Sequence, residues 1–315
     1  MILDFEKQYA SSLQRIIREG TLQKNRTAVD VYSIAHQYFH LKNIIDEFPI
    51  LRGKQVFPLM ALKEMVWILF GRNDVQFLND YGVTYWDEWK LDDGTIGKTY
   101  GYQMRKFDGH VDQLERVLNE MEQSPESRRL LINLFNPSQL NEMALPPCLH
   151  CYNFQCTKIS NETVADLYKV DLHAHMRSGD SFLGLPYNFM NTAWTLYLIC
   201  GYLNVRAGYV KYMPNDVHLT VDNYHLYVNH KKQAKQYIKN TKENLNEALS
   251  YKTKMPSMST INYICENKIF SDFNEYLKYI FELFVSKDNR KLRLEYTGPN
   301  EMKNTYKTIV ADIAV

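Results

Sequence analysis

The sharpest chemical signal in the sequence is the segment Ala144-Leu-Pro-Pro-Cys148. Two prolines fix the backbone immediately before a cysteine, and a rigid approach lowers the entropy that a nucleophile loses on reaching attack geometry. A cysteine reacts as its thiolate, which nearby positive charge stabilises. Arg128, Arg129 and Arg177 could supply that charge. The pattern therefore favours covalent catalysis by Cys148.

Two other interpretations of Cys148 stay open on the residues alone. An isolated cysteine is more often a small core residue than a nucleophile. The run Cys148-Leu-His150-Cys151, followed by Cys156, also resembles a metal site. No second Cys/His pair lies at the distance usual for zinc, and strand alternation would point Cys148 and Cys151 to opposite faces. We therefore expect no metal at this position.

The elements that must position these residues are strands mixed with buried helices, which indicates an α+β or α/β architecture. Hydrophobic periodicity predicts helices over 4–19, 59–70, 111–123, 188–203 and 273–286, and strands over 129–135, 151–158 and 165–175. Gly20 follows the first helix and suits a C-terminal left-handed position. No repeat or linker divides the chain, so we expect one domain over residues 1–315.

Composition excludes several classes of protein. The net charge is +1, so no overall field attracts DNA or an anionic membrane, and an anion site must be built from a few placed arginines. The five cysteines have no secreted-domain spacing, which favours a reducing compartment. The N-terminus does not read as a signal peptide, and the longest apolar stretch is too short to span a bilayer. We expect a cytoplasmic protein.

Motifs along nearly the whole chain resemble the thymidylate synthase family, in the order that the family has them. The signature around the cysteine resembles the family's catalytic segment, and other motifs stand on both sides of it. They are Asn25-Arg26-Thr27, Glu64-Met-Val-Trp67, Trp86-Asp-Glu-Trp89, Gly97-Lys-Thr-Tyr100-Gly, Ser127-Arg-Arg, Asn136-Pro, Met143-Ala-Leu-Pro-Pro-Cys148, Arg177-Ser-Gly-Asp180-Ser-Phe-Leu-Gly-Leu-Pro-Tyr-Asn188 and His225-Leu-Tyr227-Val-Asn-His230.

The resemblance implies the α+β thymidylate synthase fold. In that fold a mixed β-sheet forms the dimer interface, and helices pack around a long buried helix. It also implies an obligate homodimer, in which Arg128 and Arg129 reach into the partner subunit's site.

The chemistry that the resemblance implies begins when Cys148 attacks C6 of the pyrimidine, which makes C5 a carbon nucleophile. C5 takes a one-carbon unit from 5,10-methylenetetrahydrofolate. Hydride then gives a methyl group, whereas water gives a hydroxymethyl group. Glu64, on an apolar helix, would relay protons, and Tyr100 would stand beside C5. Asn188 would read uracil, which favours dUMP over dCMP.

The remaining roles also come from the resemblance. The phosphate would bind to four arginines and a serine: Arg26, Arg128, Arg129, Arg177 and Ser178. His225 and Tyr227 would hold the sugar 3′-hydroxyl. The folate side would consist of Asp180, Trp86, Trp89, Gly184 and an apolar C-terminal tail, 309–315, that ends in Val315 and closes over the site.

Some positions depart from the family pattern, namely Phe57, Met104, Leu149, Asn153 and 221–223, and the stretch 208–225 is longer than usual. These changes leave the cysteine, arginines, asparagine and glutamate intact. Three outcomes therefore stay open: dUMP methylation, which we favour; hydroxymethylation of dUMP or, less readily, dCMP, as in related and often viral enzymes acting in a host cytoplasm; and an inactive nucleotide- or RNA-binding family member.

Overall fold

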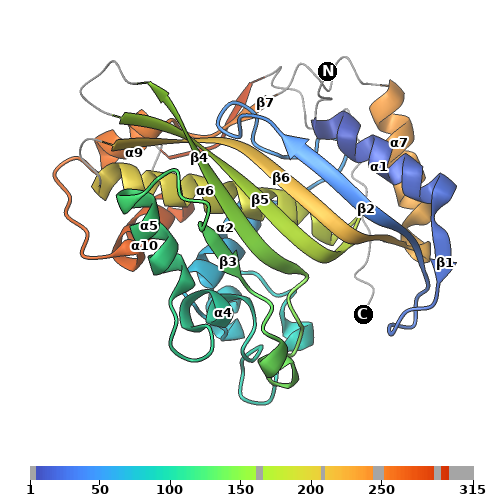
Figure 1. Ribbon diagram of the computed structural model, residues 1–315. Coiled ribbons are helices and arrows are strands. Elements are labelled where there is room, and N and C mark those ends of the chain that lie inside the picture. The colour runs from blue at the N-terminus through green and yellow to red at the C-terminus, as the bar shows by residue number, and fades with distance from the viewer. Residues whose placement is uncertain (1–4, 161–165, 207–209, 244–251, 287–291, 298–315) are drawn as a thin grey trace.

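A long helix, α6 (Gly184–Arg206), lies along one face of a six-stranded sheet in the computed structural model (Figure 1). The structure describes residues 5–160, 166–206, 210–243, 252–286 and 292–297. Nearly every side chain of α6 after its first turn is buried, because the sheet covers one side of it and other helices cover the rest. The fold is α+β around a long buried helix, as expected.

The sheet has the strand order β1-β2-β6-β5-β4-β3. Its members are β1 (Thr21–Gln23), β2 (Val31–Leu41), β3 (Leu131–Asn133), β4 (Leu149–Ser160), β5 (Asp166–Asp180) and β6 (Val210–Tyr227). Strands β5 and β6 are parallel and are connected through α6, whereas the other neighbours are antiparallel, so the sheet is mixed. Two short strands, β7 (Lys252–Lys254) and β8 (Glu295–Thr297), form a separate pair.

The two faces of the sheet differ in polarity. Along β5, Leu172, Ala174 and Met176 are buried, while His173 and His175 between them are half-buried on the opposite side. Because side chains alternate along a strand, this pattern separates a core face from a second face. No described helix lies over the centre of the second face (Figure 1), which we call the open face; it carries Tyr38, His40, His173, His175 and His218.

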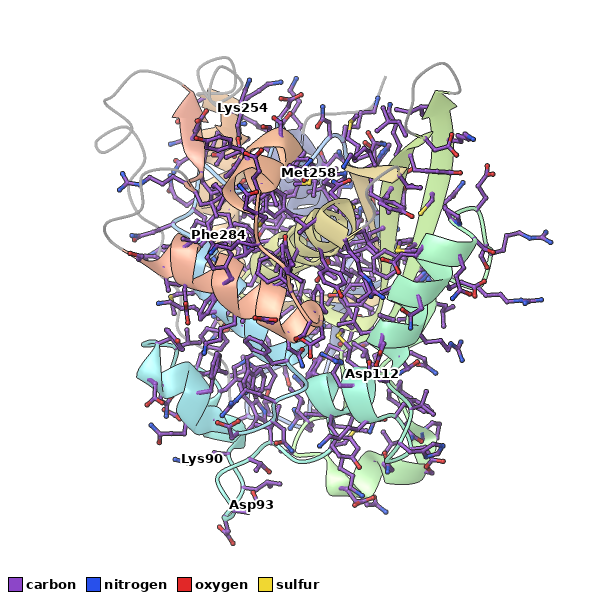
Figure 2. All side chains as sticks on the ribbon, turned by 90° about the vertical axis from the view of Figure 1, so that its left-hand side faces the viewer. Lys90, Asp93, Asp112, Lys254, Met258 and Phe284 are labelled. Carbon is purple, nitrogen blue, oxygen red and sulfur yellow. The ribbon has the colours of Figure 1, made fainter. Side chains whose placement is uncertain are left out.

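Helices build the layer on the core face. Figure 2 shows α6 between the strands on one side and α9 and α10, marked by Met258 and Phe284, on the other. The Phe284 ring packs edge-on against Trp194 of α6, with centroids 5.1 Å apart. The other helices are α1 (Phe5–Glu19), α2 (Pro58–Leu69), α3 (Val75–Asp80), α4 (Tyr100–Lys106), α5 (Gln113–Gln123), α7 (Lys231–Glu243), α9 (Met258–Ile264) and α10 (Phe273–Val285), with 3₁₀ turns η1 (Asp87–Trp89), η2 (Pro137–Glu142) and η3 (Val228–His230).

All eight predicted elements occur, with changes at their ends. The strand predicted over 129–135 is paired only over Leu131–Asn133, and α6 begins one turn before residue 188, at Gly184. The expected left-handed conformation at Gly20 was wrong, because its φ is not positive. A side chain there would instead come within 2.4 Å of the Ile16 carbonyl oxygen. In the described ranges, no helix is long and apolar enough to cross a membrane.

Candidate active site

Cys148 stands at the entrance to β4, where three neighbouring groups hold its backbone. Its N–H donates to the Tyr100 hydroxyl at 2.9 Å, and its carbonyl accepts from the Arg177 N–H at 2.9 Å. The Arg177 guanidinium donates to the carbonyls of Pro147 and Pro146 at 2.9 and 2.7 Å. The two prolines that restrict this segment are thus also fixed through their carbonyl oxygens, which orients the cysteine.

Two arginines lower the pKa of the Cys148 thiol, but their effect is smaller than that of burial. Arg177 Nη2 lies 3.9 Å from Cys148 Sγ, and both Arg177 and the more distant Arg26 favour the thiolate. Burial acts in the opposite direction and is the larger effect, so the pKa of the Cys148 thiol is raised above its usual range. Arg177 therefore acts on the thiol as expected, but burial outweighs it within this chain and favours the neutral thiol.

Tyr100 begins α4 with a φ of 25°, in the left-handed region that a tyrosine rarely adopts. The Thr99 hydroxyl beside it donates to the Leu145 carbonyl at 2.9 Å, which ties this turn to the segment that carries Cys148. Burial and the nearby Cys148 raise the pKa of Tyr100 well above its usual range. Tyr100 is therefore a neutral phenol that can donate or pass on a proton.

Glu64 is buried on α2, where the polar groups of Asn191, Trp86 and Tyr85 all favour its charged form. Trp86 Nε1 donates to one carboxylate oxygen at 2.7 Å, and Asn191 Nδ2 donates to the other at 2.7 Å. Both bonds favour the carboxylate, but desolvation outweighs them and raises the pKa of Glu64. The Trp86 ring also contacts Trp89 and Tyr100, with centroids 5.5 and 5.7 Å away. Glu64, Trp86 and Trp89 thus form one network of contacts. It extends to Tyr100, which is hydrogen-bonded to Cys148.

The first turn of α6 brings Asp180, Gly184 and Asn188 together. A side chain added at Gly184 would meet the Asp180 Cβ at 3.8 Å and the Asn188 Oδ1 at 3.9 Å, which are ordinary contact distances. Asp180 accepts a 3.0 Å hydrogen bond from the Phe182 N–H, which fixes one of its oxygens. Asn188 is half-buried, and its side chain makes no hydrogen bond to the described residues. Its amide can therefore bind a ligand.

Pairing of β5 with β6 sets a second group of predicted residues side by side. Asp180 is the register partner of His225, and Ser178 Oγ lies 3.4 Å from His225 Nδ1. Burial lowers the pKa of His225, although Asp180 opposes the shift, so the imidazole is neutral near pH 7. The ring of Tyr227 stands 5.5 Å from that of His225. The Tyr227 hydroxyl accepts a 3.5 Å hydrogen bond from Asn25, the residue before Arg26.

The structure does not bring every predicted residue to Cys148. Arg128 and Arg129 are exposed beside the edge strand β3, and the arginines that lower the pKa of Cys148 are instead Arg177 and Arg26. Val315 and the tail 309–315 lie outside the described residues. Among the described residues, Cys148, His150 and Cys151 do not form a group that could hold a metal ion.

Two polar groups in the site went unpredicted. Asn191, which binds Glu64, lies three residues after Asn188, and this spacing places both on one face of a helix. Lys54 is buried, donates to the Phe182 carbonyl at 2.6 Å, and has its pKa lowered by burial to about 8 although Asp180 opposes the shift. No sequence signal separates Lys54 from the chain's many exposed lysines.

Comparison with known proteins agrees with this arrangement. The family model described as thymidylate synthase matches residues 7–276. Three curated relatives, each called thymidylate synthase, come from the Dugway 5J108-111, RSA 331 / Henzerling II and RSA 493 / Nine Mile phase I strains of Coxiella burnetii. Each is 35% identical over 217 residues, which cover 68% of this chain and 78% of the relative.

Proposed function

Because this chain belongs to the thymidylate synthase family of methyltransferase enzymes, we propose that it methylates dUMP at C5 to give dTMP. 5,10-Methylenetetrahydrofolate is the co-substrate that supplies the carbon unit and the hydride. The observation that carries the proposal is the fixed position of Cys148, between the Tyr100 hydroxyl on its N–H and the Arg177 guanidinium beside its sulfur.

The reaction starts with addition of Cys148 to C6 of the uracil. The sulfur–C6 bond forms as the C5–C6 electron pair moves toward C5 and O4, and the thiol proton passes to water. Because the pKa of Cys148 is raised, proton loss accompanies substrate binding rather than preceding it. Arg177, 3.9 Å from the sulfur, stabilises the charge that develops there. Together with Arg26 and Ser178, it also binds the phosphate.

The base is recognised by the amide of Asn188, which accepts from N3–H and donates to O4 of uracil. Cytosine presents the opposite pattern, so dUMP is the preferred substrate. Glu64 moves protons near O4, and its raised pKa suits exchange close to neutral pH. Tyr100, already hydrogen-bonded to Cys148, assists removal of the C5 proton. Neutral His225 and Tyr227 bind the sugar 3′-hydroxyl.

The folate lies over Asp180, Gly184, Trp86 and Trp89, and the role predicted for Val315 falls outside the described residues. Gly184 supports this position for the folate. A side chain at residue 184 would not clash with any neighbouring atom of the described chain, so packing within the chain does not explain the glycine. A bare backbone at that point instead lets a flat ring system approach closely. Asp180 keeps one oxygen on the Phe182 N–H and offers the other to a ligand donor.

The active form is a homodimer in which each subunit lends Arg128 and Arg129 to the phosphate site of the other. The exposure of both guanidiniums, away from Cys148 of their own chain, supports this assignment. The partly apolar, half-buried open face is the surface through which the two sheets meet.

Hydroxymethylation by water is the second candidate. It is favoured by Phe57, which stands where the family has a folate-side histidine and is 46% exposed at the start of α2. The test is to incubate the full-length protein with dUMP and 5,10-methylenetetrahydrofolate, then to weigh the nucleotide and follow dihydrofolate by absorbance. Equal amounts of dTMP and dihydrofolate support the synthase. A hydroxymethyl product with no dihydrofolate rejects it, and the Cys148→Ser variant is the inactive control.

A further inference from the structure

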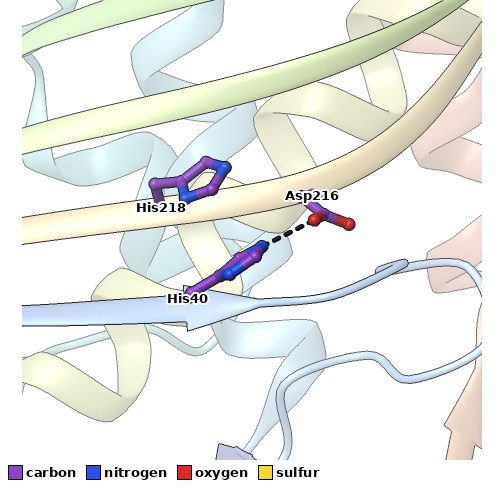
Figure 3. A group of neighbouring side chains, drawn as sticks. All are labelled: His40, Asp216 and His218. Carbon is purple, nitrogen blue, oxygen red and sulfur yellow. Dashed lines mark hydrogen bonds and ion pairs between the residues drawn. The ribbon is translucent and has the colours of Figure 1, made fainter. Parts of the chain in front are cut away.

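Three potential metal ligands meet on the open face, far along the sheet from Cys148. Figure 3 shows His40 of β2 beside Asp216 and His218 of β6, and one donor atom from each lies within 4.8 Å of the others. His40 and His218 are direct register partners in the antiparallel pair. Asp216 precedes His218 by two residues, so both point to the same face. The strand pairing itself therefore brings the three together.

Hydrogen bonds from outside the cluster orient His218 and Asp216. Tyr38 shares a 2.7 Å hydrogen bond with Nδ1 of His218, which leaves Nε2 for another partner. The Asn43 N–H donates to one oxygen of Asp216 at 2.9 Å, and the other oxygen lies 2.6 Å from His40 Nε2. Protein metal ligands usually have such a hydrogen bond at their second polar atom, which fixes tautomer and orientation.

We propose that His40, Asp216 and His218 bind a divalent transition-metal ion of the Zn²⁺ class. Two imidazoles and one carboxylate form the mixed nitrogen and oxygen set that Zn²⁺ accepts, whereas Mg²⁺ and Ca²⁺ prefer oxygen alone. Ligand atoms of a tetrahedral zinc lie about 3.3 Å apart when each is about 2.05 Å from the ion. His40 Nε2 and Asp216 Oδ2 are 2.6 Å apart, so a bound ion replaces their direct hydrogen bond and these two atoms move apart toward that value.

The position indicates a structural role rather than a catalytic one. His218 precedes His225 by seven residues on β6, which corresponds to roughly 23 Å of strand. In the isolated chain the His40 and Asp216 side chains are 17% and 19% exposed, and in the proposed homodimer, on which this placement rests, an ion bound there lies between the two sheets. An ion bound there links β2 to β6 directly, and binding to the folded state alone raises stability.

The test uses the full-length protein, stripped of metal with a chelator and titrated with Zn²⁺ by calorimetry, and with Co²⁺ by visible absorption. We expect one ion per chain, a higher Tm on addition of Zn²⁺, and a Co²⁺ band typical of tetrahedral coordination. His40→Ala, Asp216→Asn and His218→Ala should each weaken Zn²⁺ binding at least about tenfold. Asp216→Asn removes the charge but keeps an oxygen for the Asn43 N–H.

His175→Ala is the matched control, since it removes an imidazole from the same face without touching the cluster. It should bind Zn²⁺ as the wild type does. Circular dichroism of the metal-free variants separates loss of ligands from loss of fold. Zn²⁺ affinity that is equal in the wild type and all three correctly folded cluster variants would place the ion elsewhere, for example on the free cysteines. That result, or absence of any Zn²⁺-induced Tm shift, overturns the proposal.

Discussion

The phenolic oxygen of Tyr100 accepts a hydrogen bond from the backbone nitrogen of Cys148, 2.9 Å away. The same tyrosine opens α4 with a positive φ, so an unfavourable backbone conformation is maintained at the residue that holds the nucleophile. Strain of this kind persists only where surrounding contacts impose it, and it concentrates at functional sites. The position of the cysteine thus depends on one hydroxyl contributed from 48 residues away in the chain.

The first prediction is that Tyr100→Phe lowers kcat by about 10²- to 10⁴-fold, because it removes a positioned proton-transfer group. It also leaves the N–H of Cys148 without its acceptor, which costs about 1–3 kcal/mol of unfolding free energy. Steady-state kinetics and urea denaturation measure the two effects. Tyr102→Phe in the same helix is the control, since its ring instead lies over the Lys98 ammonium. Equal losses of kcat and of unfolding free energy in both variants would mean that Tyr100 only stabilises helix α4 and has no role in proton transfer.

The second prediction concerns Glu64, whose pKa is raised on folding by burial. Below about pH 4.3 the carboxyl is protonated in both states, and its burial costs nothing extra. As pH rises through the folded-state pKa, the unfolded chain ionises more readily, so stability is lost. We expect Glu64→Gln to match the wild type near pH 4 and to exceed it in Tm near pH 8, while turnover falls. The side-chain oxygen Oδ1 of Asn191, which has no partner in the described structure, can accept from the new amide.

Thermal melts across this pH range, at constant ionic strength, provide the check. A Glu64→Gln variant less stable than the wild type at pH 8 would show that the two hydrogen bonds to the carboxylate outweigh its desolvation.

The third prediction is that Gly184→Ala raises KM for methylenetetrahydrofolate about tenfold or more while leaving the fold intact. The added Cβ meets no atom of the described chain closer than 3.8 Å, and alanine favours a helix more than glycine does. Stability should therefore stay the same or rise slightly, and KM for dUMP should change little. A variant with unaltered folate kinetics would exclude close approach of folate at this backbone position.

The fourth prediction follows from the exposed positions of Arg128 and Arg129. Cys148→Ala and the double variant Arg128→Ala, Arg129→Ala are each expected to be inactive or nearly so. Refolding them together in equal amounts should restore about a quarter of wild-type activity, because half of the dimers then contain one intact site. If each chain used its own arginines, every mixed dimer would have two defective sites, and activity would stay near zero.

Sequence patterns predicted much of this fold because several helices and strands have a regular pattern of buried residues. Helix α2 is apolar almost all round, and the alternation of β5 matches its two different faces. Strand β2 was not predicted, since its open-face residues are only partly buried and His36 interrupts the alternation with a φ of 51°. Strand β6 contains Pro214 and Asp216, which are uncommon in strands, and pairing on both sides maintains it.

The site, like the fold, could be predicted from the sequence only in part. Residue types and spacing indicated Cys148, and the family resemblance indicated Asn188 and Glu64, which the structure places on α6 and α2, with Cys148 at the entrance to β4. The raised pKa of Cys148 could not be predicted, because desolvation depends on how the completed fold encloses the sulfur. Asn191 escaped attention for a similar reason, since its importance lies in a partner 127 residues away.

The strand order has a consequence for how the chain acquires its structure during synthesis. Strand β2 ends at Leu41, but its inner neighbour, β6, begins only at Val210, so the N-terminal part emerges from the ribosome long before its partner exists. Pairings between such distant segments form slowly, and their unpaired edges are open to aggregation in the meantime. Chains interrupted before β6 should therefore be insoluble, and productive folding should depend on chaperones that protect β2 until translation is nearly complete.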